Sequence, residues 1–143
     1  MKQIFNQEFL DTLLAQAQES PRLRQNFDLR TSTEDTSQRM LNALQPYTEV
    51  PIHKHDETSE TVVCLFGKLE EIFYEEVTEY ITEMNSGTQE VLKKRSFKET
   101  ARHLLCPAEG VYGIQIPAGV WHTIRVLEPS IIFEAKDGAY VPR

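Results

Sequence analysis

Residues 51–67 read PIHKHDETSETVVCLFG, and we expect the rest of the chain to be organised around this stretch. It places His53 and His55 two positions apart and adds Glu60 at the start of a valine-rich run. In an extended strand, residues i and i+2 lie on one face, about 7 Å apart, so two imidazoles at this spacing can reach one ion. His122 follows in IPAGVWH as a fourth ligand. The pattern predicts a divalent metal site inside a small β-barrel.

Length and composition indicate one globular domain. The chain has 143 residues and a formal net charge of −7, without the clustered basic footprint that nucleic-acid binding needs. No run approaches the length of a membrane span, and the N-terminus lacks the cleavage site of a signal peptide. Two cysteines at unrelated positions, Cys64 and Cys106, suggest reduced and buried thiols. We therefore expect a cytoplasmic protein with no nucleic-acid or membrane partner.

An amphipathic helix is predicted from Asn6 to Gln18, because apolar residues recur there with the helical period. Asn6 is a suitable N-cap, and Ser20-Pro21 ends the helix. We divide the single domain into residues 1–30, a helix and basic linker packed on the barrel, and residues 31–143, the barrel itself.

The predicted linker, SPRLRQNFDLR at residues 20–30, is basic in an otherwise acidic chain. Arg22 and Arg24 either pair with nearby carboxylates as solvated side chains or bind an anionic ligand, if this segment lies at a pocket mouth.

From residue 38 onward the pattern predicts strands. QRMLNALQP (38–46) and residues 60–66 are strand-like, and VYGIQIP (111–117), HTIRVLE (122–128) and SIIFEAK (130–136) form three short strands between PAG and EPS turns. Residues 68–99 are predicted as a long hairpin turning near Gly87 with oppositely charged cross-strand partners, the alternative being a disordered acidic loop. Short strands with Gly and Pro turns favour a sandwich or a closed barrel.

Three of the four histidines belong to the predicted metal site, whereas His103 is expected to be structural or exposed. Imidazole suits Zn, Fe, Cu and Ni, and a carboxylate adds Mn. Glu60 is expected as a ligand; the alternatives are an acid or base beside the metal, or a residue that orients a ligand histidine.

Further polar residues are candidates for ligand binding. Lys136, next to Asp137, could bind an anionic substrate or act as a base. Arg39 and Asn42 precede the histidines on a predicted strand and either line the barrel or are exposed, because an error of one residue reverses the face. Trp121 is expected in the core or at the rim of the barrel.

The metal-site residues carry a family resemblance. Residues 53–67 resemble the first cupin motif, with the order His-Lys-His, four residues, Glu60, six residues and Gly67. Residues 117–122 (PAGVWH) resemble the second motif. More narrowly, the chain is similar to the WbuC-type cupin metalloproteins in SPRLRQNFDLR, QRMLNAL, IPAGVWHTI and FEAKDGAYVP. Departures from the cupin pattern are Tyr47 and Val111 at glycine positions and Val126 at an asparagine position. We expect the turn at Tyr47 to differ.

The resemblance implies a mainly all-β fold: a cupin double-stranded β-helix, or jelly-roll barrel, with an added N-terminal helix. It also implies a homodimer, a metal on His53, His55, Glu60 and His122, and an association with surface polysaccharides.

Three functions follow. One is an enzyme that uses Zn, Fe, Mn or Ni on a small polar substrate such as a sugar or sugar nucleotide. The second is a non-catalytic, metal-dependent binding or sensor module. The third, a structural metal site, is least favoured because three nitrogens and one oxygen leave a coordination position open.

Overall fold

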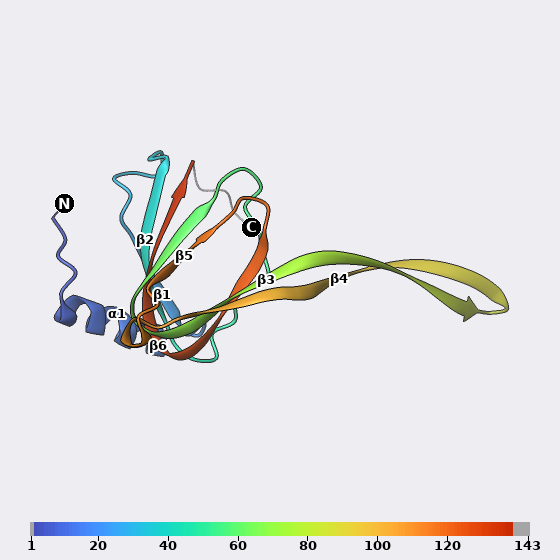
Figure 1. The fold of residues 1–143 in the computed structure, drawn as a ribbon, viewed down its shortest axis with the longest axis horizontal. Coiled ribbons are helices and arrows are strands. Elements are labelled where there is room, and N and C mark those ends of the chain that lie inside the picture. Colours follow the sequence, from blue (N-terminus) through green and yellow to red (C-terminus); the bar gives the residue numbers. More distant parts are fainter. Residues whose placement is uncertain (1, 139–143) are drawn as a thin grey trace.

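The computed structural model describes residues 2–138, which form a β-barrel with one helix outside it and one long hairpin projecting from it (Figure 1). In chain order the elements are α1 (Gln7–Glu19), β1 (Arg24–Asp28), β2 (Ser37–Leu44), β3 (Glu60–Asn85), β4 (Thr88–Leu105), a 3-10 turn (Pro107–Glu109), β5 (Gly113–Ile116) and β6 (Trp121–Asp137). The prediction of a mainly all-β fold with an N-terminal helix is confirmed.

All strand pairs are antiparallel, in the order β1-β2-β6-β3-β4, with β5 also beside β3. Strands β3 and β6 run the length of the barrel and bend together where their register shifts between Phe66 and Lys68. Gly67 lies at this bend with φ 102°, and a Cβ there would collide with the Pro129 carbonyl oxygen. Only glycine fits a position that combines positive φ with so close an approach.

The prediction of two strands separated by an EPS turn is wrong, because Trp121–Asp137 form one continuous strand, β6. Pro129 lacks an N–H group, yet the strand continues because the Ser130 hydroxyl links the chains at the bend. Its Oγ accepts from the Lys68 N–H at 2.9 Å and lies 2.7 Å from the Glu128 carbonyl oxygen, to which it donates.

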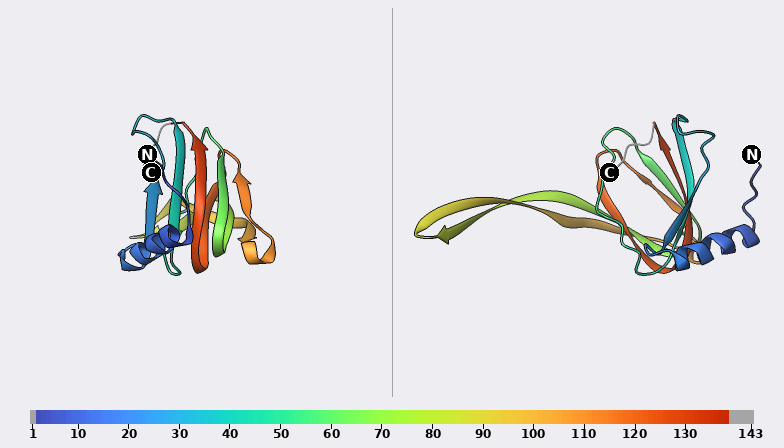
Figure 2. Two further views of the ribbon diagram at one scale, coloured as in Figure 1. Left: turned by 90° about the vertical axis from the view of Figure 1, so that its left-hand side faces the viewer. Right: turned by 180° about the vertical axis from the view of Figure 1, so that it is seen from behind.

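Side chains alternate along β2 and so separate two apolar cores. Leu41 and Ala43 face outward and pack with Leu13 and Ala17 of α1, which lies across the outer face of the sheet (Figure 2). The inner core fills the barrel and comprises Leu44, Val62, Cys64, Leu69, Leu105, Ile116, Val126 and Ile132. Cys64 and Cys106 are both buried and free, as predicted.

Helix α1 begins as predicted, with the Asn6 Oδ1 accepting the Phe9 N–H at 2.9 Å, and ends at Ser20. Among the described residues, no helix has the length and apolarity needed to span a membrane.

The predicted basic linker is wrong in part, because residues 24–28 form β1. This strand pairs with β2 from Arg24 opposite Leu44 to Asp28 opposite Met40. Phe27 anchors it outside the barrel by edge-on contact with Phe9 of α1, at a ring separation of 5.0 Å. Pairing with β2 therefore outweighs the polar composition, and the sheet begins before residue 31.

The hairpin of β3 and β4 confirms the prediction for residues 68–99 and extends far from the barrel (Figures 1 and 2). Ser86 and Gly87 both have positive φ, as a two-residue type I′ turn requires. Glu79 faces Lys94 across the strands, and all side chains from residue 78 to residue 95 are exposed. We call residues 78–95 the arm.

Candidate metal centre

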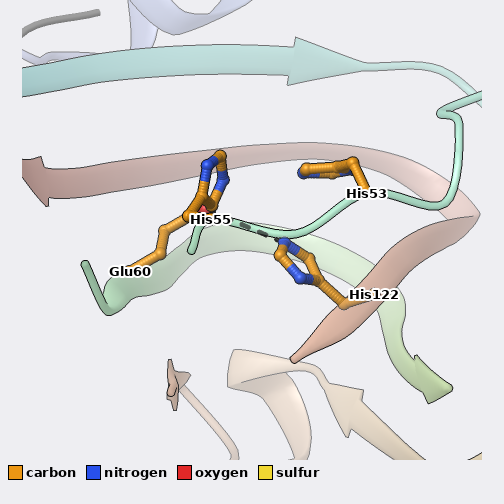
Figure 3. Close-up of side chains that lie close together, drawn as sticks. All are labelled: His53, His55, Glu60 and His122. Carbon is orange, nitrogen blue, oxygen red and sulfur yellow. Dashed lines mark ion pairs between the residues drawn. The ribbon is translucent and has the colours of Figure 1, made fainter. Parts of the chain in front are cut away.

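The four predicted metal ligands meet at one place in the barrel. Each of His53, His55, Glu60 and His122 offers one ligand atom, and these atoms all lie within 4.8 Å of one another (Figure 3). Glu60 is the first residue of β3 and His122 the second of β6, whereas both other histidines come from the segment between β2 and β3.

His53 and His55 do not lie on a regular strand, which corrects the prediction. His53 makes a single bridge with His122: the two backbone N–H groups donate to each other's carbonyls at 3.0 and 2.8 Å. The His55 carbonyl accepts the Gly119 N–H at 2.7 Å. Backbone contacts with the PAGVWH segment therefore hold the His-Lys-His segment, in place of a continuous ladder.

Two imidazoles are oriented by backbone carbonyls. The Nδ1 of His53 lies 2.8 Å from the Pro51 oxygen, and the Nδ1 of His122 lies 2.9 Å from the Val120 oxygen. A carbonyl only accepts, so each Nδ1 carries the hydrogen and each Nε2 presents a lone pair. This is the tautomer that a metal ligand needs.

His55 lies between two charged groups. Its Nε2 is 2.9 Å from Glu60 Oε2, and its Nδ1 is 3.1 Å from the ammonium of Lys136. Lys136 is opposite Glu60 in the register of β3 and β6. The same Glu60 oxygen lies 3.8 Å from His122 Nε2, so the carboxylate contacts two of the three imidazoles.

The imidazoles keep Glu60 ionised. Burial acts to raise the pKa of this carboxyl, but the hydrogen bond from His55 and the electrostatic interactions with His122, His55 and His53 outweigh it. The pKa lies below its usual value of 4.5, so Glu60 is available as an anionic ligand.

A cavity of about 650 Å³ opens beside the four residues. Four of the residues predicted to bind a ligand line it: Arg22, Arg24, Asn42 and Lys136. Neither arginine pairs with a carboxylate within residues 2–138, and the Arg24 Nη1 donates to the Glu49 carbonyl at 3.1 Å.

Arg39 lies away from this cavity. Its position in β2 is on the outward face, and its guanidinium donates to the Leu29 carbonyl at 3.0 Å and contacts Asp35 at 3.2 Å. Its placement gives no support to a role in ligand binding.

Glu71 is a cavity residue that the sequence predictions missed. It is 2% exposed, and its Oε2 has no hydrogen-bond partner among residues 2–138. Burial, and then the charges of Glu60 and Glu134, raise its pKa well above 4.5. A signal was present in the sequence, since Glu71 lies between Leu69 and Phe73 at alternate, inward-facing positions.

The three departures from the cupin pattern have structural explanations. Tyr47 adopts φ 75°, a left-handed conformation that glycine favours. Val126 is buried in the inner core, and Val111 closes a small bridge with Cys106.

Other predicted residues lie outside the centre. His103 is exposed beside Phe73, and Trp121 is half-buried with Lys54 and Arg95 over its ring at 4.9 and 5.1 Å. Residues 139–142 of FEAKDGAYVP are outside the described residues.

Comparisons with known proteins show the fold. Similar solved structures include the conserved protein SPY1581 of unknown function from Streptococcus pyogenes, with 11% identity, a TM-score of 0.55, and coverage of 87% of this chain and 86% of that one. Capsular polysaccharide assembling protein CapF from Staphylococcus aureus has 16% identity, a TM-score of 0.53, and coverage of 86% and 30%. Oxalate oxidase has 12% identity, a TM-score of 0.53, and coverage of 85% and 54%. The chain thus spans less than a third of CapF and about half of oxalate oxidase, and it shares with them the cupin jelly-roll barrel.

Sequence comparison shows the family. No curated protein matches the chain. A family model described as domain of unknown function (DUF6016) matches residues 5–85, which run from the start of α1 through both N-terminal histidines to the end of β3. Since this match covers more than half of the chain, the protein belongs to the DUF6016 family, and its fold is the cupin jelly-roll barrel.

Proposed function

We propose that this protein is a metal-binding cupin that holds one divalent transition metal and binds a small anionic ligand in the adjoining cavity. The observation that carries the proposal is the convergence of three imidazoles and one carboxylate within 4.8 Å at the wall of that cavity. The ligands are His53, His55, Glu60 and His122.

The donor set fits a divalent transition metal. Two imidazoles already present Nε2 inward, and Glu60 is ionised by its surroundings. Three nitrogens and one oxygen suit Zn, Fe, Mn or Ni and leave a position for a small molecule. A bound ion would supply Lewis acidity or activate a bound oxygen ligand.

Charge favours an anionic ligand. Arg22, Arg24 and Lys136 line the cavity, and with a divalent ion bound the positive charges outnumber the carboxylates. Sugars and sugar nucleotides of surface-polysaccharide metabolism are the first ligands to test. The resemblance to WbuC-type cupins suggests them, and one protein with the same fold assembles capsular polysaccharide.

Elemental analysis tests the metal. Protein purified without chelator is expected to contain about one equivalent of a transition metal, and His122→Ala to contain far less. His103→Ala is the matched control, because His103 is exposed and outside the site. Less than about a tenth of an equivalent in the wild type, with no rebinding, would contradict the proposal.

Turnover separates an enzyme from a binding module. The metal-loaded protein is incubated with sugar nucleotides and simple keto acids, and products are followed by mass spectrometry. Product from the wild type and none from His122→Ala indicates catalysis. Saturable binding without product indicates the alternative, a non-catalytic binding or sensor module.

A further inference from the structure

Glu71 lies beside the metal centre without belonging to it. In the register of β3 and β6 it is opposite Ile124, two residues from His122 on the same face of β6. Diagonal neighbours of this kind are about 7–8 Å apart between their backbones. Glu71 is not among the four residues whose ligand atoms lie within 4.8 Å of one another. The separation is short enough for its side chain to reach a molecule bound at the metal.

Glu71 is a buried polar side chain with apolar neighbours on its own strand. Leu69 and Phe73 flank it on the same face of β3, where an apolar residue would extend the inner core. Leaving a buried polar atom without a partner costs about 1–3 kcal/mol, so such groups call for an explanation. Glu71 Oε2 is in this position, and it lines the cavity.

Asn42 on β2 is a second side chain with a buried oxygen that lacks a partner in the described part of the chain. Its Oδ1 is buried with no hydrogen-bond partner among residues 2–138, and its side chain lines the same cavity. Leu41 and Ala43 on either side face α1, so the parity of β2 directs Asn42 inward. Two strands therefore each contribute one unsatisfied polar side chain to the cavity wall.

We propose that Glu71 and Asn42 form a recognition subsite for the hydroxyl groups of a sugar acid whose carboxylate is held by the cations of the cavity. The inference rests on the proposed function and deepens it by naming the ligand class.

Hydrogen-bonding capacity supports this class. A carboxyl in the protonated form, which burial of Glu71 favours, offers one O–H donor and further acceptor sites, and an amide offers an acceptor and two donors. A sugar hydroxyl both donates and accepts, so it can satisfy either side chain. Arg24 and Lys136 line the same cavity and supply the positive charge that a carboxylate needs.

The experiment uses galacturonate as the probe and protein loaded with one equivalent of Zn²⁺. Calorimetric titration is expected to show saturable binding to the wild type. Glu71→Leu and Asn42→Leu should each weaken binding by about tenfold or more, whereas Glu71→Gln, which keeps a donor and an acceptor, should stay within about threefold. Glu70→Gln is the matched control, because Glu70 is the next residue and pairs with Arg102 outside the cavity.

A second readout separates binding from structure. Without galacturonate, Glu71→Leu is expected to raise the unfolding temperature, because an apolar side chain replaces a buried polar group that lacks a partner. A lower unfolding temperature, or loss of Zn²⁺ from this variant, would overturn the proposal by making Glu71 a structural or metal-site residue.

The remaining outcomes are also decisive. Wild-type affinity in Glu71→Leu would overturn the subsite, and equal losses in the Leu and Gln variants would overturn a neutral hydrogen-bonding role. A zinc-loaded wild type that does not bind galacturonate would overturn the ligand class. Failure of the wild type to bind Zn²⁺ at all would instead contradict the proposed function, so the two failures are distinguishable.

Discussion

Gly67 controls the bend through which β3 and β6 pass together. Gly67→Ala would force a side chain onto a residue with φ 102° and against the carbonyl of Pro129. We expect a loss of about 3 kcal/mol or more in the free energy of unfolding, since neither strand can move without breaking the ladder. Urea denaturation followed by circular dichroism measures this.

Gly87→Ala is the matched control for that prediction. Gly87 also has positive φ, 80°, but a Cβ there meets nothing within 4 Å. The substitution is therefore expected to lower the free energy of unfolding by about 1 kcal/mol, through the backbone conformation alone. Equal losses in the two variants would mean that the contact at Pro129 is not the dominant effect.

Asp35 stabilises the turn before β2 in a pH-dependent manner. Its carboxylate accepts the backbone N–H groups of Thr31 and Ser37, which lower its pKa from 3.8 to about 2. A carboxyl whose pKa is lower in the folded state stabilises the fold at pH values above its unfolded-state pKa. This stabilisation is lost as the pH falls through the folded-state pKa. Asp35→Asn should therefore be less stable than wild type at neutral pH, and the difference should shrink from about pH 4 toward about pH 2.

Thermal unfolding at several pH values checks this prediction. Glu34→Gln, at an exposed neighbouring position, serves as the control for removing one negative charge. A pH-independent difference between Asp35→Asn and the wild type would contradict the account.

At the scale of elements, we expect the arm to be separable from the barrel, which Arg95 at the base of the arm contacts through the Trp121 ring. Val77 and Ser96 face each other in the register of β3 and β4, so an Asn-Gly turn can join them in place of residues 78–95. All side chains of the arm are exposed, and we expect the unfolding temperature to change by less than about 4 °C with Zn²⁺ binding retained. A variant that fails to fold or to bind Zn²⁺ would show that the arm supports the barrel.

The elements differ in how well the sequence predicts them. Helix α1 and the β3–β4 hairpin can be predicted because their sequence signals are local. The helix has an apolar stripe with an N-cap, and the hairpin has a turn with Ser86 and Gly87. Strand β1 and the continuity of β6 cannot, because β1 depends on its pairing with β2, and β6 depends on the link between the Ser130 hydroxyl and Lys68, 62 positions away in the chain.

At the scale of the whole molecule, the cupin resemblance predicts a homodimer with barrels paired edge to edge. Sedimentation velocity should give the mass of two chains in place of one 16.5-kDa chain. The variant without the arm should sediment as the same dimer, since the predicted contact lies on the barrel. A monomeric wild type would contradict the prediction, and a monomeric variant would place the contact on the arm.

The chemical identity of the four side chains at the candidate metal centre is determined by the sequence itself. The His-x-His spacing, Glu60 and the later His122 specify which atoms converge, because ligand chemistry depends on residue type and order along the chain.

The cavity around that centre is decided by tertiary structure. Whether Arg39 or Asn42 faces inward depends on strand parity, and the position of Glu71 depends on the register shift at Gly67. Pairing between distant strands sets both features, and local sequence preferences do not encode it. The sequence therefore determined the candidate metal ligands, and the packed barrel decided which polar side chains surround them.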